Sequence, residues 1–330
     1  MVKLIFLSFG VLFLVALFGH IGIQPILQAV SDLGPLALAI ILLPMILVYA
    51  LEALGWHLTL GSYAGKVGFG KLFAIRMAGE SINVTTPTAY MGGEPFKAML
   101  LEQYGVPLVK GFSSVVTAKT TMILAEVFFI LIGLGLGFGV LETSDHSIAA
   151  TLIGLALMGC GILAFFLMQR YGLATGVLHV LDMIRLRLKV LESVRTQCKE
   201  FDQITREFYT ERRRTFFLAL LIFFIAWLTE AVEVYAILYY LGEPINLIAS
   251  VSIAALAVLI KGGMFFIPGS LGGQEGGYML LLLGYGYPDV TGITFALIRR
   301  LREIVWILLG FICFMFFKRR KAVTLTEPIS

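Results

Sequence analysis

The sequence predicts an all-α protein that crosses a membrane several times, and three observations support this class. Of the 330 residues, 59% are hydrophobic and 14% are charged, whereas soluble domains carry roughly 25% charged residues. The mean hydropathy is +0.93. Several apolar runs reach the roughly 20 residues that a helix needs to cross a bilayer. They cover residues 4–23, 33–59, 108–141, 148–168, 215–241 and 294–317.

These runs predict about six spanning helices within one membrane domain that covers residues 1–330. No small-residue cleavage site follows the first run, so we interpret it as a retained helix rather than a signal peptide. Basic residues cluster within 66–76, 170–214 and 318–321, while the link at 142–146 is acidic. Because basic loops stay on the cytoplasmic side, we expect both termini in the cytoplasm and the helices in a bacterial inner membrane.

Two further apolar stretches, residues 70–104 and 246–286, are broken by glycine, proline and polar residues. In each stretch a proline is followed seven residues later by a glutamate, and 25 residues after that by a cation in the next apolar run. Another charge precedes each proline by seven residues, and all four matches share an offset of 181 residues. The matched pairs are Glu80 and Lys261, Pro87 and Pro268, Glu94 and Glu275, and Lys119 and Arg300.

The matched spacing predicts two opposed re-entrant hairpins in an inverted repeat. With helices that alternate in direction, the first stretch begins at the cytoplasmic face and the second at the outer face. We place repeat one at about residues 1–141 and repeat two at about 147–317. A glycine-rich tip that leads into a helix exposes backbone N–H groups to an anion. The expected tip residues are Pro87, Gly92, Gly93, Pro268, Gly269, Gly272 and Gly273.

The link between the fourth and fifth apolar runs, about residues 171–214, predicts a cytoplasmic amphipathic helix. Apolar residues recur at steps of three and four from Ile184 to Phe208, and arginine and lysine occupy the other faces. Two interpretations remain open for this helix. It can bind anionic lipid headgroups at the membrane surface, or it can pack against the cytoplasmic ends of the bundle.

Many charged residues lie within or beside the apolar segments. Each charge at the centre of a membrane helix costs about 2.5–3.5 kcal/mol, so we expect these side chains to face the interior of the bundle in pairs. Glu230 and Glu233 have no cation nearby in their own helix and need partners from elsewhere. Together these charges predict a polar cavity of mixed sign. The substrate-binding candidates are Asn83, Pro87, Gly92, Gly93, Glu94, Lys119, Glu126, Pro268, Gly272, Gly273, Gln274, Glu275, Arg299, Arg300 and Glu303.

Within this set, Lys119 and Arg300 are expected to bind an anionic headgroup with help from the N–H groups of the tips. Glu94 and Glu275 are expected to pair with those cations or to take the positive part of a headgroup. The sequence contains no P-loop, no HExxH and no cysteine–histidine cluster. We therefore expect no metal, no cofactor, no nucleic-acid partner and no catalytic site.

Two segments resemble the signatures of a flippase-like family named for the transmembrane domain of lysylphosphatidylglycerol synthases. The first carries Arg76, Ser81, Asn83 and Pro87, then Gly92-Gly93-Glu94 and Ala98-Met99-Leu100-Leu101. The second runs from Phe266 to Tyr278 and continues at Arg300-Leu301-Arg302-Glu303. Its segment Gln274-Glu275-Gly276-Gly277-Tyr278 is most similar to the hopanoid-associated branch of the family.

This resemblance covers essentially the whole chain and implies a lipid-translocating membrane domain. The soluble aminoacyl-transferase domain of true synthases is missing from this sequence, so lipid aminoacylation is not implied. Gly273 stands where many relatives carry a bulkier residue, which leaves the choice of substrate open.

The function that these observations favour is the translocation of an amphiphilic lipid with an anionic or zwitterionic headgroup. One alternative is a proton- or ion-coupled transporter of small solutes, in which Glu80, Glu230 and Glu233 carry protons. Another is a non-transporting partner of lipid-biosynthetic enzymes, docked through the link helix. A cavity that opens sideways to lipid favours the first function, and a sealed cavity favours the solute transporter.

The basic clusters generate a prediction about topology. Reporter domains fused after Lys71, Lys199 and Lys321 should all show cytoplasmic activity, because each site follows a basic segment. A reporter fused near Ser144 should show the opposite location. A non-cytoplasmic signal from the fusion at Lys199 would overturn the whole arrangement.

Overall fold

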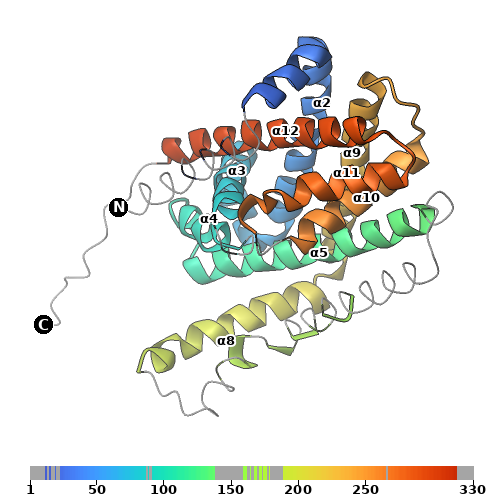
Figure 1. The fold of residues 1–330 in the computed structure, drawn as a ribbon. Helices are drawn as coiled ribbons and strands as arrows, with labels where there is room; N and C mark the ends of the chain where they lie inside the picture. The colour runs from blue at the N-terminus through green and yellow to red at the C-terminus, as the bar shows by residue number, and fades with distance from the viewer. Residues whose placement is uncertain are drawn as a thin grey trace, which may run out of the picture.

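The computed structural model describes residues 23–86, 88, 91–137, 189–264 and 267–317, with isolated positions at 12–19 and 159–178. All elements assigned within these residues are helices, as expected for the all-α class (Figure 1). Apart from isolated positions, the predicted first and fourth spanning runs lie outside the described residues. The acidic link, Pro87 and both termini lie outside them as well.

Four long helices form the frame of the bundle. They are α2 (Ile23–Thr59), α5 (Leu108–Gly137), α9 (Arg213–Tyr240) and α12 (Asp289–Phe316). In the described part of the chain, three segments are long and apolar enough to cross a membrane: Leu33–Thr59, Leu108–Gly137 and Arg213–Tyr240. Helix α12 has 28 residues, which is also enough, but its charged segment from Arg299 to Glu303 interrupts the apolar run. The backbone of α2 kinks at Gly34 (φ 73°), just before Pro35.

The two broken stretches fold as pairs of short helices. Helices α3 (Phe69–Thr85) and α4 (Gly93–Glu102) form the first pair, and α10 (Leu247–Gly263) and α11 (Gly273–Gly284) form the second. The 10 residues of α4 cover about 15 Å, half of the roughly 30 Å hydrocarbon core. Each pair therefore forms a hairpin too short to cross twice, as the sequence predicts.

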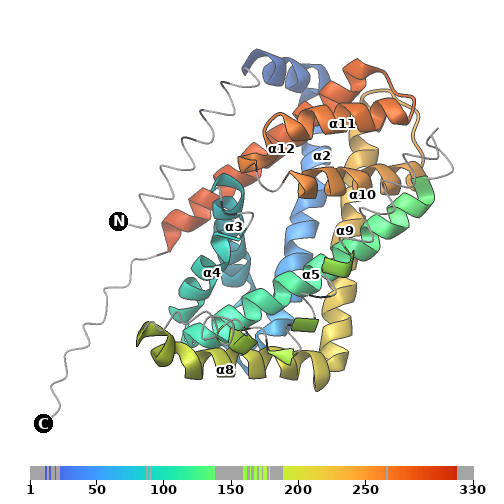
Figure 2. The same cartoon turned by 60° about the horizontal axis from the view of Figure 1, so that its bottom comes forward.

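The two halves of the bundle exchange equivalent contacts. Helices α2 and α9 lie side by side at the centre, α5 packs against α10, and α12 packs against α3 (Figure 2). The last long helix of each half thus contacts the hairpin of the other half, as the predicted repeat requires. A serine bridges each contact: Ser81 Oγ donates to the Ile307 carbonyl (3.0 Å) and Ser252 Oγ donates to the Gly133 carbonyl (2.5 Å).

Glycines allow these helices to approach closely. A Cβ atom on Gly310 of α12 would overlap Ser81 and the backbone of α3, and a Cβ atom on Gly133 of α5 would overlap Ala255 of α10. Lipid tails are as apolar as leucine side chains, so helices in a bilayer associate through such small-residue contacts and interhelical hydrogen bonds.

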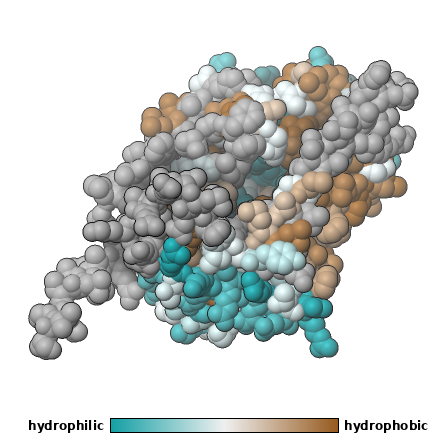
Figure 3. All heavy atoms as spheres, turned by 90° about the horizontal axis from the view of Figure 1, so that it is seen from below, coloured by the Kyte–Doolittle hydropathy of each residue, from teal (hydrophilic) through white to brown (hydrophobic). Residues whose placement is uncertain are grey.

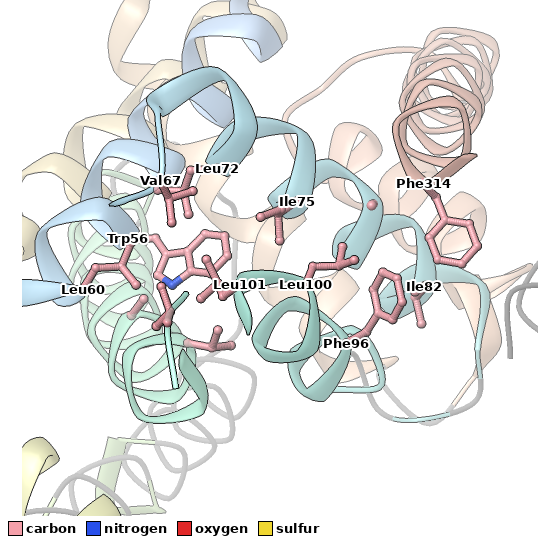
Figure 4. Packing of buried hydrophobic residues seen from close by; sticks show 14 of the residues in the cluster. Trp56, Leu60, Val67, Leu72, Ile75, Ile82, Phe96, Leu100, Leu101 and Phe314 are labelled. Atoms are coloured by element: carbon pink, nitrogen blue, oxygen red, sulfur yellow. The ribbon is translucent and has the colours of Figure 1, made fainter. Parts of the chain in front are cut away.

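A hydrophobic core holds the first hairpin against its neighbours. Trp56 of α2 packs with Leu72 and Ile75 of α3 (Figure 4). At the other end of this core, Phe96 of α4 lies 4.9 Å, ring to ring, from Phe314 of α12. The hairpin is therefore anchored at both ends by apolar contacts, which leaves its polar residues to face the middle of the bundle.

The link contains the amphipathic helix α8 (Lys189–Thr210). Phe201 lies 5.7 Å, ring to ring, from Phe112 of α5, and Glu200 forms a 3.1 Å ion pair with Lys110. Hydrophilic residues gather on the side of the molecule where α8 lies (Figure 3). Of the two interpretations of the link, packing against the bundle is observed, while binding of anionic lipid stays a prediction.

The glycine contact between α5 and α10 generates a prediction about stability. Gly133→Ala should lower the thermal unfolding midpoint in detergent, because overpacking a tight contact costs about 1–3 kcal/mol. Gly135→Ala on the same helix is the matched control, because a Cβ atom there meets no atom within 4 Å. Alanine favours a helix over glycine by about 0.5–1 kcal/mol, so the control should be neutral or stabilising. Equal midpoints for the two variants would contradict the packing argument.

Candidate functional site

A cavity of about 320 Å³ lies inside the bundle and carries ten charged side chains. Its walls come from both long helices and hairpin helices of the two halves. Most of the lining residues are buried or half-buried, but Met91 and Gly262 are exposed. These two residues lie at the ends of the two hairpins, so the cavity opens there. Its charged lining residues are Glu52, Arg76, Glu80, Lys119, Glu126, Glu230, Lys261, Arg299, Arg302 and Glu303.

A second, smaller cavity of about 40 Å³ adjoins the first on the side of hairpin one. Glu94 and Lys97 of α4 line it, and Glu80 and Lys119 line both cavities. Lys119 therefore stands between the hairpin carboxylates and the main cavity.

Contacts within the hairpin hold the tip of hairpin one. Asn83 Oδ1 accepts from the Gly93 N–H (2.6 Å), and its Nδ2 donates to Glu94 (2.9 Å). Lys97 Nζ donates to both oxygens of Glu94, at 3.0 and 3.1 Å. Glu94 is thus paired with Lys97 and not with Lys119, which corrects the pairing expected from the repeat.

An arginine from α12 holds the tip of hairpin two. Arg300 donates to Glu275 (2.7 Å from Nε), to the Gly269 carbonyl (2.9 Å) and to Glu303 (2.6 Å). The other Glu275 oxygen accepts from the Gly272 N–H at 2.8 Å and so caps α11. Arg300 is 1% exposed and lies behind the wall of the cavity. The expected pair of Glu275 and Arg300 is therefore present, in a position that fastens the tip to α12.

Three of the N–H groups at the tips already have acceptors within the protein. Gly92 donates to the Thr88 hydroxyl (2.8 Å), Gly93 to Asn83 and Gly272 to Glu275. The expectation that tip N–H groups are free to bind an anion is wrong for these three, because neighbouring side chains accept from them, and it stays a prediction for the first turn of α11.

The α12 wall of the cavity is neutralised by carboxylates from α9. Arg299 lies 2.8 Å from Glu230 and 3.5 Å from Glu233, and Arg302 also pairs with Glu233. These contacts confirm that Glu230 and Glu233 find cations on another helix. Glu303 in turn accepts from Lys261 of α10 at 2.7 Å and from Gln274 of α11 at 3.1 Å.

Two charged residues of the cavity wall stand apart from this network. Lys119 and Glu126, both on α5, form no hydrogen bond or ion pair with any described residue. An uncompensated charge is costly inside a bundle, so such groups are candidates for contact with a ligand.

The structure places the predicted site residues in three groups. Lys119, Glu126, Arg299 and Glu303 line the main cavity, and Glu94 lines the small one. Pro87 lies outside the described residues. The remaining candidates form or fasten the tips: Asn83, Gly92, Gly93, Pro268, Gly272, Gly273, Gln274, Glu275 and Arg300.

Sequence reasoning left Glu52, Arg76 and Lys97 out of the candidate site. Glu52 and Arg76 are buried, form an ion pair and line both cavities. A signal for Glu52 was present, because it lies 181 residues before Glu233, the same offset as in the other matched pairs. Lys97 had no such signal, since Tyr278 occupies the matching position.

Comparison with known proteins identifies the family of the chain. The sequence model of the lysylphosphatidylglycerol synthase TM region matches residues 1–310. A UPF0104 membrane protein of Methanothermobacter thermautotrophicus is 27% identical over 301 residues, which cover 87% of this chain and 86% of the relative. A UPF0104 membrane protein of Methanocaldococcus jannaschii is 22% identical over 329 residues, which cover 96% and 95%. The chain is therefore an integral membrane protein that belongs to the family of the lysylphosphatidylglycerol synthase transmembrane region.

Proposed function

We propose that this protein moves an amphiphilic lipid with a charged headgroup between the two leaflets of the membrane. The observation that carries the proposal is the charged cavity of about 320 Å³, which reaches exposed residues at the hairpin ends and has in its wall a lysine without an ion pair among the described residues. An isolated charge in hydrocarbon costs several kcal/mol or more, so a headgroup needs a polar path across the midplane.

The outer surface of the bundle suits a lipid whose tails stay in the bilayer. Large apolar side chains such as Leu43 of α2, Leu131 of α5 and Leu221 of α9 are exposed. Only the headgroup then needs the cavity, since the tails can remain in contact with the lipid-facing surface throughout. An opening between Met91 and Gly262 favours this arrangement over a sealed solute pathway.

Lys119 and Arg300 take different roles in this proposal. Lys119 is available to bind the anionic part of a headgroup, because it forms no hydrogen bond or ion pair with a described residue. Arg300 is a positioning residue, because its contacts with Glu275, Gly269 and Glu303 fasten hairpin two to α12. We further propose that helix α8 and both termini lie on the cytoplasmic side of a bacterial inner membrane, with α8 near anionic lipid headgroups.

One alternative has a specific observation in its favour. Glu126 is a carboxyl group in the cavity wall without a hydrogen bond or ion pair among the described residues, as expected of a proton carrier in a solute transporter. Reconstituted vesicles loaded with a pH-sensitive dye separate the two functions. Lipid movement without proton flux supports the flippase, and proton flux that needs a soluble substrate supports the alternative.

Lys119 generates a prediction about transport. In proteoliposomes with a fluorescent phospholipid, Lys119→Gln should slow lipid movement about tenfold or more, because a charge-assisted hydrogen bond contributes about 1.5–3 kcal/mol. Lys119→Arg should retain much of the rate, because it keeps the charge. The matched control is Lys110→Gln on the same helix, since Lys110 pairs with Glu200 of α8 away from the cavity. If folded Lys119→Gln moves lipid at the normal rate, Lys119 does not bind the headgroup.

Arg300 generates a prediction about stability. Arg300→Gln should destabilise the protein by about 3–5 kcal/mol, because it leaves the half-buried Glu275 without its cation and leaves the buried Glu303 with Lys261 alone. Lys119→Gln should leave the thermal unfolding midpoint near that of the unchanged protein. Lys199→Gln, at an exposed position of α8, controls for the loss of a positive charge. If Arg300→Gln unfolds at the normal temperature, Arg300 does not fasten the hairpin.

A further inference from the structure

The main cavity is balanced in charge. Five of its lining residues are acidic and five are basic, within the described part of the chain. Behind this wall, the fully buried Glu233 pairs with two of the basic residues and Lys97 lies 3.9 Å from Glu80, so these two outer residues add one charge of each sign. A headgroup with a net negative charge would leave such a cavity with an uncompensated anion. A headgroup with one charge of each sign would keep the balance.

The ion pairs decide which charges remain available to a ligand. Glu52 pairs with Arg76, Glu230 with Arg299 and Glu303 with Lys261, while Arg302 pairs with Glu233. Glu80 accepts a hydrogen bond from Asn83 (3.3 Å) and lies 3.9 Å from Lys97. Among the described residues of the cavity wall, Lys119 and Glu126 are left without a hydrogen bond or ion pair, one of each sign, although Lys119 lies close enough to attract Glu80.

These two residues lie on one face of one helix. They are seven residues apart on α5, which places them within about 20° of each other around the helix and about 10.5 Å apart along its axis. Both line the main cavity. A headgroup that carries a phosphate and an ammonium group can therefore meet both side chains from the same side.

An aromatic ring lies beside this face. Trp227 of α9 lines the cavity and donates its Nε1–H to the Met122 carbonyl of α5 at 3.3 Å, one turn before Glu126. Aromatic rings attract ammonium groups through their faces, and tryptophan does so most strongly. Trp227 and Glu126 together supply the two kinds of group that bind an ammonium ion.

We propose that the headgroup bound in the cavity is zwitterionic, with its phosphate at Lys119 and its ammonium group at Glu126 and Trp227. This inference rests on the proposed lipid movement and adds the class of headgroup. The ammonium group favours the ionised form of the Glu126 carboxyl group, because a nearby opposite charge favours the charged state. The pair on α5 thus selects for a headgroup with both charges and against one with a phosphate alone.

The test compares two fluorescent lipids with the same tails in proteoliposomes, phosphatidylethanolamine and phosphatidylglycerol. The unchanged protein should move phosphatidylethanolamine several-fold faster. Glu126→Gln should remove this preference, chiefly by slowing phosphatidylethanolamine about tenfold, whereas Lys119→Gln should slow both lipids. Glu207→Gln, at an exposed position on α8, is the matched control and should keep the preference. Trp227→Leu should weaken the preference and serves as the second variant if Glu126→Gln does not fold.

The outcomes separate this inference from the function on which it rests. A folded Glu126→Gln that keeps the preference, or an unchanged protein that moves both lipids equally, overturns the zwitterion inference while lipid movement stands. No movement of either lipid above that in protein-free vesicles overturns the proposed function itself. Uptake of soluble glycerophosphoethanolamine without lipid movement overturns the lipid as the source of the headgroup. Lipid movement without such uptake supports it.

Discussion

The cost of placing a charge in a medium that cannot solvate it is the constraint on which the rest of this structure depends. Buried arginines on α12 are tolerated because α9 supplies Glu230 and Glu233 opposite Arg299 and Arg302. Those pairs join α9 to α12 within repeat two, and these two helices in turn pack against α2 and α3 of repeat one. The same constraint makes an unpaired charge informative. Lys119 and Glu126 lie where a charged residue is expected to be paired, and neither forms a hydrogen bond or ion pair with a described residue.

The two hairpins share a sequence pattern, but the matched spacing places their glutamates in different ion pairs. In hairpin two, Glu275 caps α11 and pairs with Arg300, so the tip is fastened to a long helix. In hairpin one, Lys97 donates hydrogen bonds to the carboxylate of Glu94, so the ion pair lies within the hairpin. Tyr278 stands at the position of repeat two that matches Lys97, and it offers no cation to Glu275. Because Lys97 pairs with Glu94, Lys119 does not pair with it and lines the cavity instead. Arg300 pairs with Glu275 and holds the hairpin, although both cations follow their glutamate by 25 residues.

The cavity and helix α8 of the link lie in different parts of the molecule. Helix α8 packs its aromatic residues on α5 and keeps charged residues such as Lys199 exposed, at the side of the molecule where hydrophilic residues gather. The cavity lies within the bundle and opens between the hairpin ends. A headgroup path through the bundle and a charged surface at one end of it are compatible parts of a protein that handles lipids. The bundle provides the path for the headgroup. Helix α8 contacts the beginning of α5 at Lys110, and Lys119 lies further along the same helix.

The sequence alone determined the class of fold, because the lengths of the apolar runs and their interruption by glycine and proline depend only on local composition. It also predicted the two hairpins and the internal repeat, because the 181-residue offset is a property of spacing. What only the tertiary structure decided was the partner of each charge. Two lysines follow Glu94 in the sequence, Lys97 after three residues and Lys119 after 25. The spacing of the repeat predicted Lys119 as the partner of Glu94, whereas the observed partner is Lys97. Ion pairs form between atoms within about 4 Å, and that proximity is set by how α3, α4, α5, α9 and α12 pack together, which no single segment of the sequence contains.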